Sequence, residues 1–316
     1  MNTKKLYLLV VLLIVLLVVI ATSYLISYLI SYYHKDMYYK FLNFILIPLY
    51  RYQTHYFTEN HEKIFKPYFR GNIEVTNNKI NINRQSKNEY SLLDKSITNG
   101  VIEDLKNSHT VDNVIKNIVK KSLKYVHYDG KPIHYDDLLF VDVLNVPGNY
   151  FPFFHTDIEW NTFCESDGFQ LWILLEEDED IAPRGNMFIM ETDIVEPGMG
   201  LKITKDKVVK TFSGSIFEKT IEEYDSLNEI NPKIKYLNAK IGEVFLMNQN
   251  VLHCSDPIVY NSKRRAINLR VIYKKKDNVK LCNLNNTYSM LLKSKYDIDC
   301  HNDYCVFSKA NKIKEL

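Results

Sequence analysis

The sequence has little glycine and proline, and its charges almost cancel. It contains ten glycines and nine prolines in 316 residues, without a low-complexity tract or an internal repeat. Lys and Arg total 40 against 38 Asp and Glu, which gives a net charge of +2. A nucleic-acid-binding protein usually presents a strongly basic face. We therefore expect no nucleic-acid partner.

Cysteine is also scarce, and its spacing excludes two common structural roles. The odd number of five and the absence of a C-x-x-C pair argue against a zinc knuckle and against a dense disulfide framework. Cys300 and Cys305 would pair if their part of the chain lies in an oxidising compartment. Free thiols are the simpler alternative, and the sequence does not decide between them.

One long uncharged run stands near the N-terminus. The segment from Leu6 to Ile30 is dominated by Leu, Val and Ile. A helix rises about 1.5 Å per residue, so a run of this length can cross a hydrocarbon core of roughly 30 Å. Tyrosines cluster at its far end, as in an aromatic interface belt. We expect a retained transmembrane anchor over residues 1–33, with a cleaved signal peptide as the alternative.

The charges that flank this run predict its orientation. Lys4 and Lys5 precede it together with the terminal amine. Positive charge favours the cytoplasmic side of a membrane. The sequence therefore predicts a single-pass protein with a short cytoplasmic N-terminal tail and with its domain on the lumenal or exterior side.

The remainder divides by pattern into three parts. Residues 34–135 read as a juxtamembrane and helical part, in which a helix with one apolar face follows Thr110. Residues 136–275 contain short β-type runs separated by turn residues, and the tail 276–316 is polar. This pattern predicts a mainly β domain with flanking helices, a sandwich or barrel. The seven expected strands are Leu138–Val146, Gly168–Leu175, Asn186–Glu191, Gly200–Ile203, Val208–Phe212, Gly242–Met247 and Ala266–Tyr273, and residues 217–231 look helical.

A pattern that can hold a metal lies inside the β-rich part. Residues i and i+2 of a strand point the same way, so His-x-Asp can offer two ligands to one ion. The pattern is weak by itself, because it recurs at His34, His134, His155 and His301. Only His155-Thr156-Asp157 among these four lies in the β-rich region with a later histidine, His253, after an expected strand. Two histidines and one carboxylate on one face of Fe(II) leave positions open for a chelating cosubstrate and dioxygen.

The order of several sequence blocks adds a family resemblance. The blocks are Phe154-His155-Thr156-Asp157, Phe169-Gln170-Leu171-Trp172, Gly185-Asn186-Met187-Phe188-Ile189, Gly242 to His253-Cys254-Ser255, and Asn261-Ser262-Lys263-Arg264-Arg265-Ala266. Over residues 136–275 they resemble the phytanoyl-CoA dioxygenase-like family, whose core is a double-stranded β-helix of the jelly-roll or cupin type. The resemblance implies that His155, Asp157 and His253 hold Fe(II).

The same resemblance implies how the cosubstrate is bound. An arginine eleven residues after the distal histidine, here Arg264, would bind the far carboxylate of 2-oxoglutarate. Arg270 lies on the same strand face and is the alternative, whereas Arg265 points the other way. Trp172 would line the cosubstrate pocket, or it is simply a core aromatic residue.

The sequence thus predicts a membrane-anchored dioxygenase that uses Fe(II), 2-oxoglutarate and O2 and releases succinate and CO2. In the family that the chain resembles, halogenating members replace the iron-binding carboxylate with a small residue, so the resemblance with Asp157 present implies hydroxylation. The substrate would be a small molecule, a lipid or a lumenal molecule, and its identity is beyond the sequence. Two other functions compete with this one: a membrane-tethered β-barrel binding or structural protein without turnover, and a cupin-like metal isomerase without 2-oxoglutarate.

Overall fold

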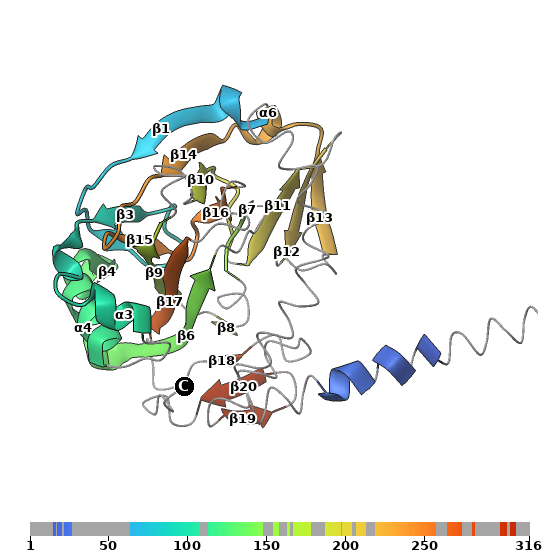
Figure 1. Cartoon of the computed structure of the whole chain (residues 1–316). Helices are drawn as coiled ribbons and strands as arrows, with labels where there is room; N and C mark the ends of the chain where they lie inside the picture. Colours follow the sequence, from blue (N-terminus) through green and yellow to red (C-terminus); the bar gives the residue numbers. More distant parts are fainter. Residues whose placement is uncertain are drawn as a thin grey trace, which may run out of the picture.

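The structure is a computed structural model of the chain (Figure 1). It describes residues 15–16, 18–20, 22–26, 64–107, 113–147, 154–157, 163–164, 167–177, 187–196, 198–203, 207–212, 219–256, 264–273, 280–281, 298–301 and 304–307. The described part is mainly β, with few helices, as the sequence predicts.

Two sheets form the body of the molecule. The first has the strand order β3-β15-β9-β17-β6 and the second the order β1-β14-β10-β16-β7-β11-β12-β13. The strands of the first sheet are β3 (Tyr90–Leu93), β6 (Leu138–Pro147), β9 (Asp167–Glu176), β15 (Val244–Asn248) and β17 (Arg265–Tyr273). Those of the second are β1 (Phe69–Ile73), β7 (Phe154–His155), β10 (Met187–Glu191), β11 (Met199–Ile203), β12 (Val208–Phe212), β13 (Lys219–Tyr224), β14 (Lys233–Leu237) and β16 (Leu252–Ser255).

Smaller elements flank these two sheets. A three-stranded sheet consists of β2 (Ile80–Asn81), β4 (Val126–Tyr128) and β5 (Lys131–Pro132). A four-stranded sheet consists of β8 (Phe163–Cys164), β18 (Lys280–Leu281), β19 (Ile298–His301) and β20 (Tyr304–Phe307), and its register sets Cys300 opposite Cys305. The helices are α3 (Ile102–Asn107), α4 (Asn113–Ser122) and α6 (Leu227–Ile230), with 3-10 turns η1 (Lys66–Tyr68), η2 (Lys95–Ile97), η3 (Leu123–Tyr125) and η4 (Tyr135–Asp137).

The central strand β9 buries both of its faces. All of its residues but the last are buried, and successive side chains point to opposite sides of the sheet. Leu171 and Ile173 pack in one apolar cluster with side chains of α3 and α4, which cover the outer face (Figure 1). Trp172 and Leu174 pack in another cluster with side chains of the second sheet. The second cluster therefore marks the interior between the sheets.

The helix expected after Thr110 is present as α4, although Thr110 itself lies outside the described residues. Its buried side chains Ile115, Ile118 and Val119 recur at helical spacing, and all three join the outer cluster. The helix thus packs against the first sheet, as a stripe of apolar residues on one face predicts.

Two asparagines connect the turn after β15 to a distant segment. Asn248 donates from its side-chain amide to the carbonyls of Asn81 and Lys87, at 3.1 and 2.9 Å. Asn250 donates to the carbonyls of Arg84 and Ser86, at 3.0 and 2.7 Å. Because this turn leads into β16, these four bonds fix the entry to the strand that carries His253.

The seven strands expected from the sequence are confirmed, with ends that differ by at most two residues. The helix expected over residues 217–231 is largely wrong. There, β13 pairs antiparallel with β12, and only the four residues of α6 are helical. The polar sequence of β13 conceals the strand because it lies at the edge of the sheet, where no alternation of burial is required.

The structure corrects the prediction of a transmembrane anchor and of a single-pass membrane location. Within Leu6–Ile30 it describes residues 15–16, 18–20 and 22–26, which are helical and exposed. Among the described residues, no helix is both long enough and apolar enough to cross a membrane. The expectation rested on the length and composition of the apolar run alone.

Truncating a buried side chain of β9 should destabilise the molecule. Leu171 is fully buried between the first sheet and the helices. We expect Leu171→Ala to lower the free energy of unfolding by about 2–5 kcal/mol, through lost burial and the cavity left behind. Urea unfolding would measure this, with Ile221→Ala on the edge strand β13 as the matched control, because Ile221 is 38% exposed. Equal losses for both variants would contradict the assigned core.

Candidate metal centre

Two histidines face each other across neighbouring strands. His155 on β7 and His253 on β16 are register partners in the antiparallel pair, and their ring centroids lie 4.4 Å apart. Their chain neighbours Phe154, Leu252 and Cys254 pack in the cluster on the outer side of the second sheet. Since side chains alternate along a strand, both imidazoles point into the interior.

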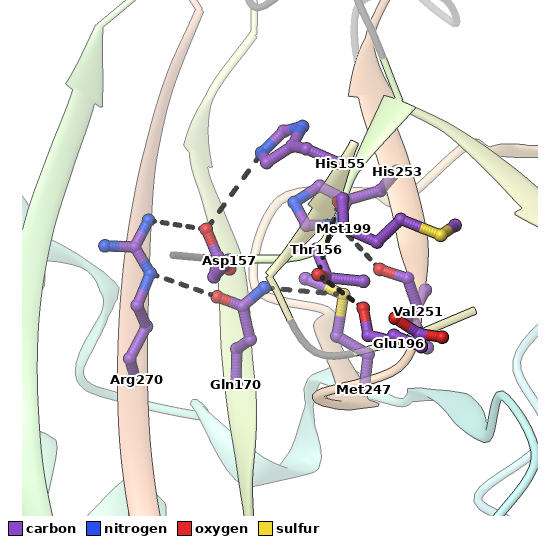
Figure 2. Close-up of polar contacts among 10 residues, drawn as sticks. All are labelled: His155, Thr156, Asp157, Gln170, Glu196, Met199, Met247, Val251, His253 and Arg270. Atoms are coloured by element: carbon purple, nitrogen blue, oxygen red, sulfur yellow. Dashed lines mark hydrogen bonds and ion pairs between the residues drawn. The ribbon is translucent and has the colours of Figure 1, made fainter. Parts of the chain in front are cut away.

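Asp157 completes the group just beyond the end of β7. Ligand atoms of His155, Asp157 and His253 all lie within 4.8 Å of one another (Figure 2). Thr156, between the first two, is held by Met199, whose carbonyl accepts the Thr156 N–H at 2.7 Å and its hydroxyl at 3.3 Å. This fixed backbone lets Asp157 reach the same space as His155. Elsewhere in the described residues no other group of three such side chains occurs.

The Asp157 carboxylate is buried beside a positive charge. Arg270 Nη2 donates to Asp157 Oδ1 at 2.9 Å, while His155 Nε2 lies 4.0 Å from the same oxygen. Burial acts to raise the pKa of Asp157, but Arg270 and, to a lesser extent, the two histidines outweigh it and lower that pKa below its ordinary value. The carboxylate is therefore ionised at neutral pH, as a metal ligand requires.

His253 is held in the tautomer that a metal needs. The distance from Nδ1 to the carbonyl oxygen of Val251 is 3.1 Å. A carbonyl only accepts, so Nδ1 carries the hydrogen and Nε2 keeps its lone pair. Burial lowers the pKa of His253, against the opposing charge of Asp157, so the ring is neutral near pH 7.

The residues fit a metal ion of the Fe(II) type. Asp157 Oδ2 is buried and has no hydrogen-bond partner, and an orphaned buried oxygen is costly unless something binds it. The two imidazoles and one carboxylate oxygen of Asp157 supply the three ligand atoms of a facial set. Such a set leaves room at the ion for other ligands, and it supports Fe(II) with 2-oxoglutarate and O2 as the cofactors.

The candidate cosubstrate residues lie in different places. Arg264 is 3% exposed, and its guanidinium carbon lies 5.7 Å from the ring centroid of Trp172. Burial lowers the pKa of Arg264 to about 10, against the charges of Tyr236 and Asp256, so it remains a cation at neutral pH. Arg265 instead pairs with Glu176 at 3.3 Å and is more exposed. Arg264 and Trp172 are thus brought together, while Arg265 is directed away from them.

Two polar residues of the interior were missed by the sequence reasoning. Gln170 accepts a hydrogen bond from Arg270 Nε at 3.3 Å. Asn268 is the register partner of Trp172 and has a buried oxygen without a hydrogen-bond partner. Both share a strand face with a residue that was predicted, Trp172 or Arg270. Strand alternation could have indicated them, because it places both on the interior face, where a polar side chain needs a partner.

The comparisons with known proteins give no family. No family model and no curated protein matches the chain, so the resemblance to the phytanoyl-CoA dioxygenase-like family stays a prediction. Among solved structures, the chain is similar to the iron and alpha-ketoglutarate-dependent endoperoxidase NvfI in a different conformation. The identity is 12% and the TM-score 0.33, over 60% of this chain and 77% of that one. A variant of the same enzyme gives 12% and 0.34, over 61% and 79%. A likeness this distant assigns no residue role.

The lowered pKa of His253 predicts a loss of stability in acid for the metal-free protein. Between its folded pKa and the ordinary 6.5, the unfolded chain binds more protons at this position, so the free energy of unfolding falls as the pH falls. One such group contributes at most about 1.4 kcal/mol for each pH unit. Urea unfolding with a chelator at about pH 7.5 and about pH 5.5 should show a smaller fall for His253→Gln than for the wild type. His134→Gln, at an exposed site, should behave as the wild type does.

Proposed function

We propose that the chain is an Fe(II)- and 2-oxoglutarate-dependent dioxygenase that hydroxylates its substrate on a double-stranded β-helix core spanning residues 136–275. The observation that carries this proposal is the convergence of His155, Asp157 and His253 on one face within 4.8 Å. The presence of the buried cation Arg264 in the same interior supports it.

Each side chain of the centre has a defined role. His253 and His155 would give neutral nitrogen ligands, and Asp157 would give the single anionic ligand. When bound, Fe(II) together with 2-oxoglutarate supplies the activation of O2 for hydroxylation of a C–H bond, with release of succinate and CO2. The residues hold these components in a dry interior and set their orientation.

Arg264 is suited to the far carboxylate of the cosubstrate. Its guanidinium is planar and can donate two parallel hydrogen bonds to a carboxylate. Trp172 lies against the guanidinium, and its ring would keep water from that contact.

A small-molecule substrate fits the exposure of the ligands. The His155 side chain is 15% exposed, whereas that of Asp157 is 4% exposed. A substrate carbon would therefore approach the centre from the side of His155. A metal isomerase would use the same three ligands but would not need Arg264, and a binding protein would need no cosubstrate at all.

Anaerobic addition of Fe(II) and 2-oxoglutarate to the full-length protein should give the weak visible charge-transfer band of the Fe(II)–2-oxoglutarate chelate. We expect the band in the wild type and its loss in His155→Ala, because one of three protein ligands is removed. His134→Ala is the matched control, since it removes a histidine from a second His-x-Asp pattern at an exposed position outside the centre. A folded wild type that gives no band would contradict the proposal.

Removing the buried cation should weaken cosubstrate binding selectively. Hydrogen bonds to a charged group contribute about 1.5–3 kcal/mol, so Arg264→Ala should raise the 2-oxoglutarate concentration for half-maximal band intensity by about 10- to 100-fold. Iron affinity without 2-oxoglutarate should stay unchanged. Arg265→Ala, the neighbouring arginine that pairs with Glu176, should leave both quantities as in the wild type. An unchanged 2-oxoglutarate requirement in Arg264→Ala would favour the isomerase or another arginine.

A further inference from the structure

Arg270 contacts both a candidate metal ligand and a neutral amide. Its Nη2 donates to Asp157 Oδ1 at 2.9 Å and its Nε donates to Gln170 Oε1 at 3.3 Å (Figure 2). Arg270 is only 9% exposed, so these contacts are made in the interior. The guanidinium thus lies between a candidate metal ligand and a neutral amide, rather than against solvent.

The amide that receives Arg270 is itself fixed. Gln170 Nε2 lies 3.7 Å from Met247 Sδ and donates to it. The backbone register sets Met247, Gln170 and Arg270 opposite one another on β15, β9 and β17. The row of three side chains is therefore a consequence of strand pairing, and its last member reaches Asp157 on the opposite side of the interior. Strand pairing in the first sheet thus places the Arg270 guanidinium where it can hold Oδ1 of Asp157.

The contact divides the two oxygens of Asp157. Oδ1 accepts from Arg270, while Oδ2 is buried and has no hydrogen-bond partner. Asp157 lies beyond the last residue of β7, next to Thr156, whose N–H is held by the Met199 carbonyl. Its side chain is oriented by Arg270. A carboxylate with both oxygens available can bind an ion through both of them and occupy one more position. With Oδ1 engaged, it offers a single oxygen.

We propose that Arg270 is a positioning residue, which holds the Asp157 carboxylate through Oδ1 so that the carboxylate presents one oxygen to the metal, and that Gln170 orients Arg270 for this task. The inference rests on the proposed function, because it assumes a metal at this centre. It also removes Arg270 from the residues that bind 2-oxoglutarate and leaves that role to Arg264. The single-oxygen binding mode keeps a position open for the cosubstrate.

Binding of Mn(II) alone to the full-length protein tests this assignment. Loss of a residue that orients a metal ligand typically costs 10- to 100-fold in affinity, and we expect about that loss for Arg270→Met, measured by electron paramagnetic resonance of free Mn(II). Arg270→Lys keeps the charge with one donor group and should recover part of the affinity. The matched control is Arg265→Met, which breaks the neighbouring arginine–carboxylate pair at Glu176 and should bind Mn(II) as the wild type does.

Two further measurements separate positioning from a loss of folding. At saturating Co(II), the visible spectrum of Arg270→Met should differ from that of the wild type, since the coordination of the carboxylate changes, while the Arg265→Met spectrum should not. Gln170→Leu should weaken Mn(II) binding by a smaller factor. The double variant Gln170→Leu with Arg270→Met should be no weaker than Arg270→Met alone, because Gln170 acts through Arg270.

The outcomes distinguish this inference from the proposed function. A wild type that binds neither Mn(II) nor the Fe(II)–2-oxoglutarate pair would overturn the proposed function. A wild type that binds both, together with Arg270→Met and Arg270→Lys variants of unchanged Mn(II) affinity and Co(II) spectrum, would overturn the positioning role. If those variants instead lost only 2-oxoglutarate affinity, Arg270 would be a cosubstrate residue and the inference would be wrong.

Discussion

Strand alternation is the constraint on which the interior of this molecule depends. The strands β9 and β17 are buried on both faces. Alternate side chains of each strand pack beneath α3 and α4, and the others point toward the second sheet. A polar residue on the face toward the second sheet is buried, where a missing hydrogen-bond partner is costly. Arg270, Gln170 and Asp157 satisfy one another in this way, and the metal centre is built where this polar row meets the two histidines.

Much of the fold, and the choice of His155, Asp157 and His253 as candidate ligands, came from local features of the sequence. His155 and Asp157 are two residues apart, and the strand that leads toward His253 is marked by an apolar run between turn residues. Spacing and run length are short-range properties, so they indicate which residues belong to strands. The same alternation rule placed Arg270 of β17 and Arg264, the residue just before that strand, on one face, although it did not separate their roles.

The contacts that give those residues different surroundings come from distant parts of the chain. Arg270 meets Asp157 across 113 positions, and no local pattern encodes that pairing. The register of β17 on β9 sets Arg270 opposite Gln170, and the packing of the two sheets brings Asp157 within reach of Arg270. The transmembrane prediction for Leu6–Ile30 was wrong because it rested on local composition alone. The edge strand β13 was missed since its polar sequence carries no burial pattern.

The amides of Asn248 and Asn250 give one surface segment a fixed length. They hold four carbonyls between residues 81 and 87, on the turn that leads to His253. Surface loops commonly tolerate insertions and deletions, but a residue gained or lost here would displace acceptors from donors that cannot follow. Among related chains that keep His155, Asp157 and His253, length variation should therefore accumulate in other loops, and this segment should keep its size even where its side chains change.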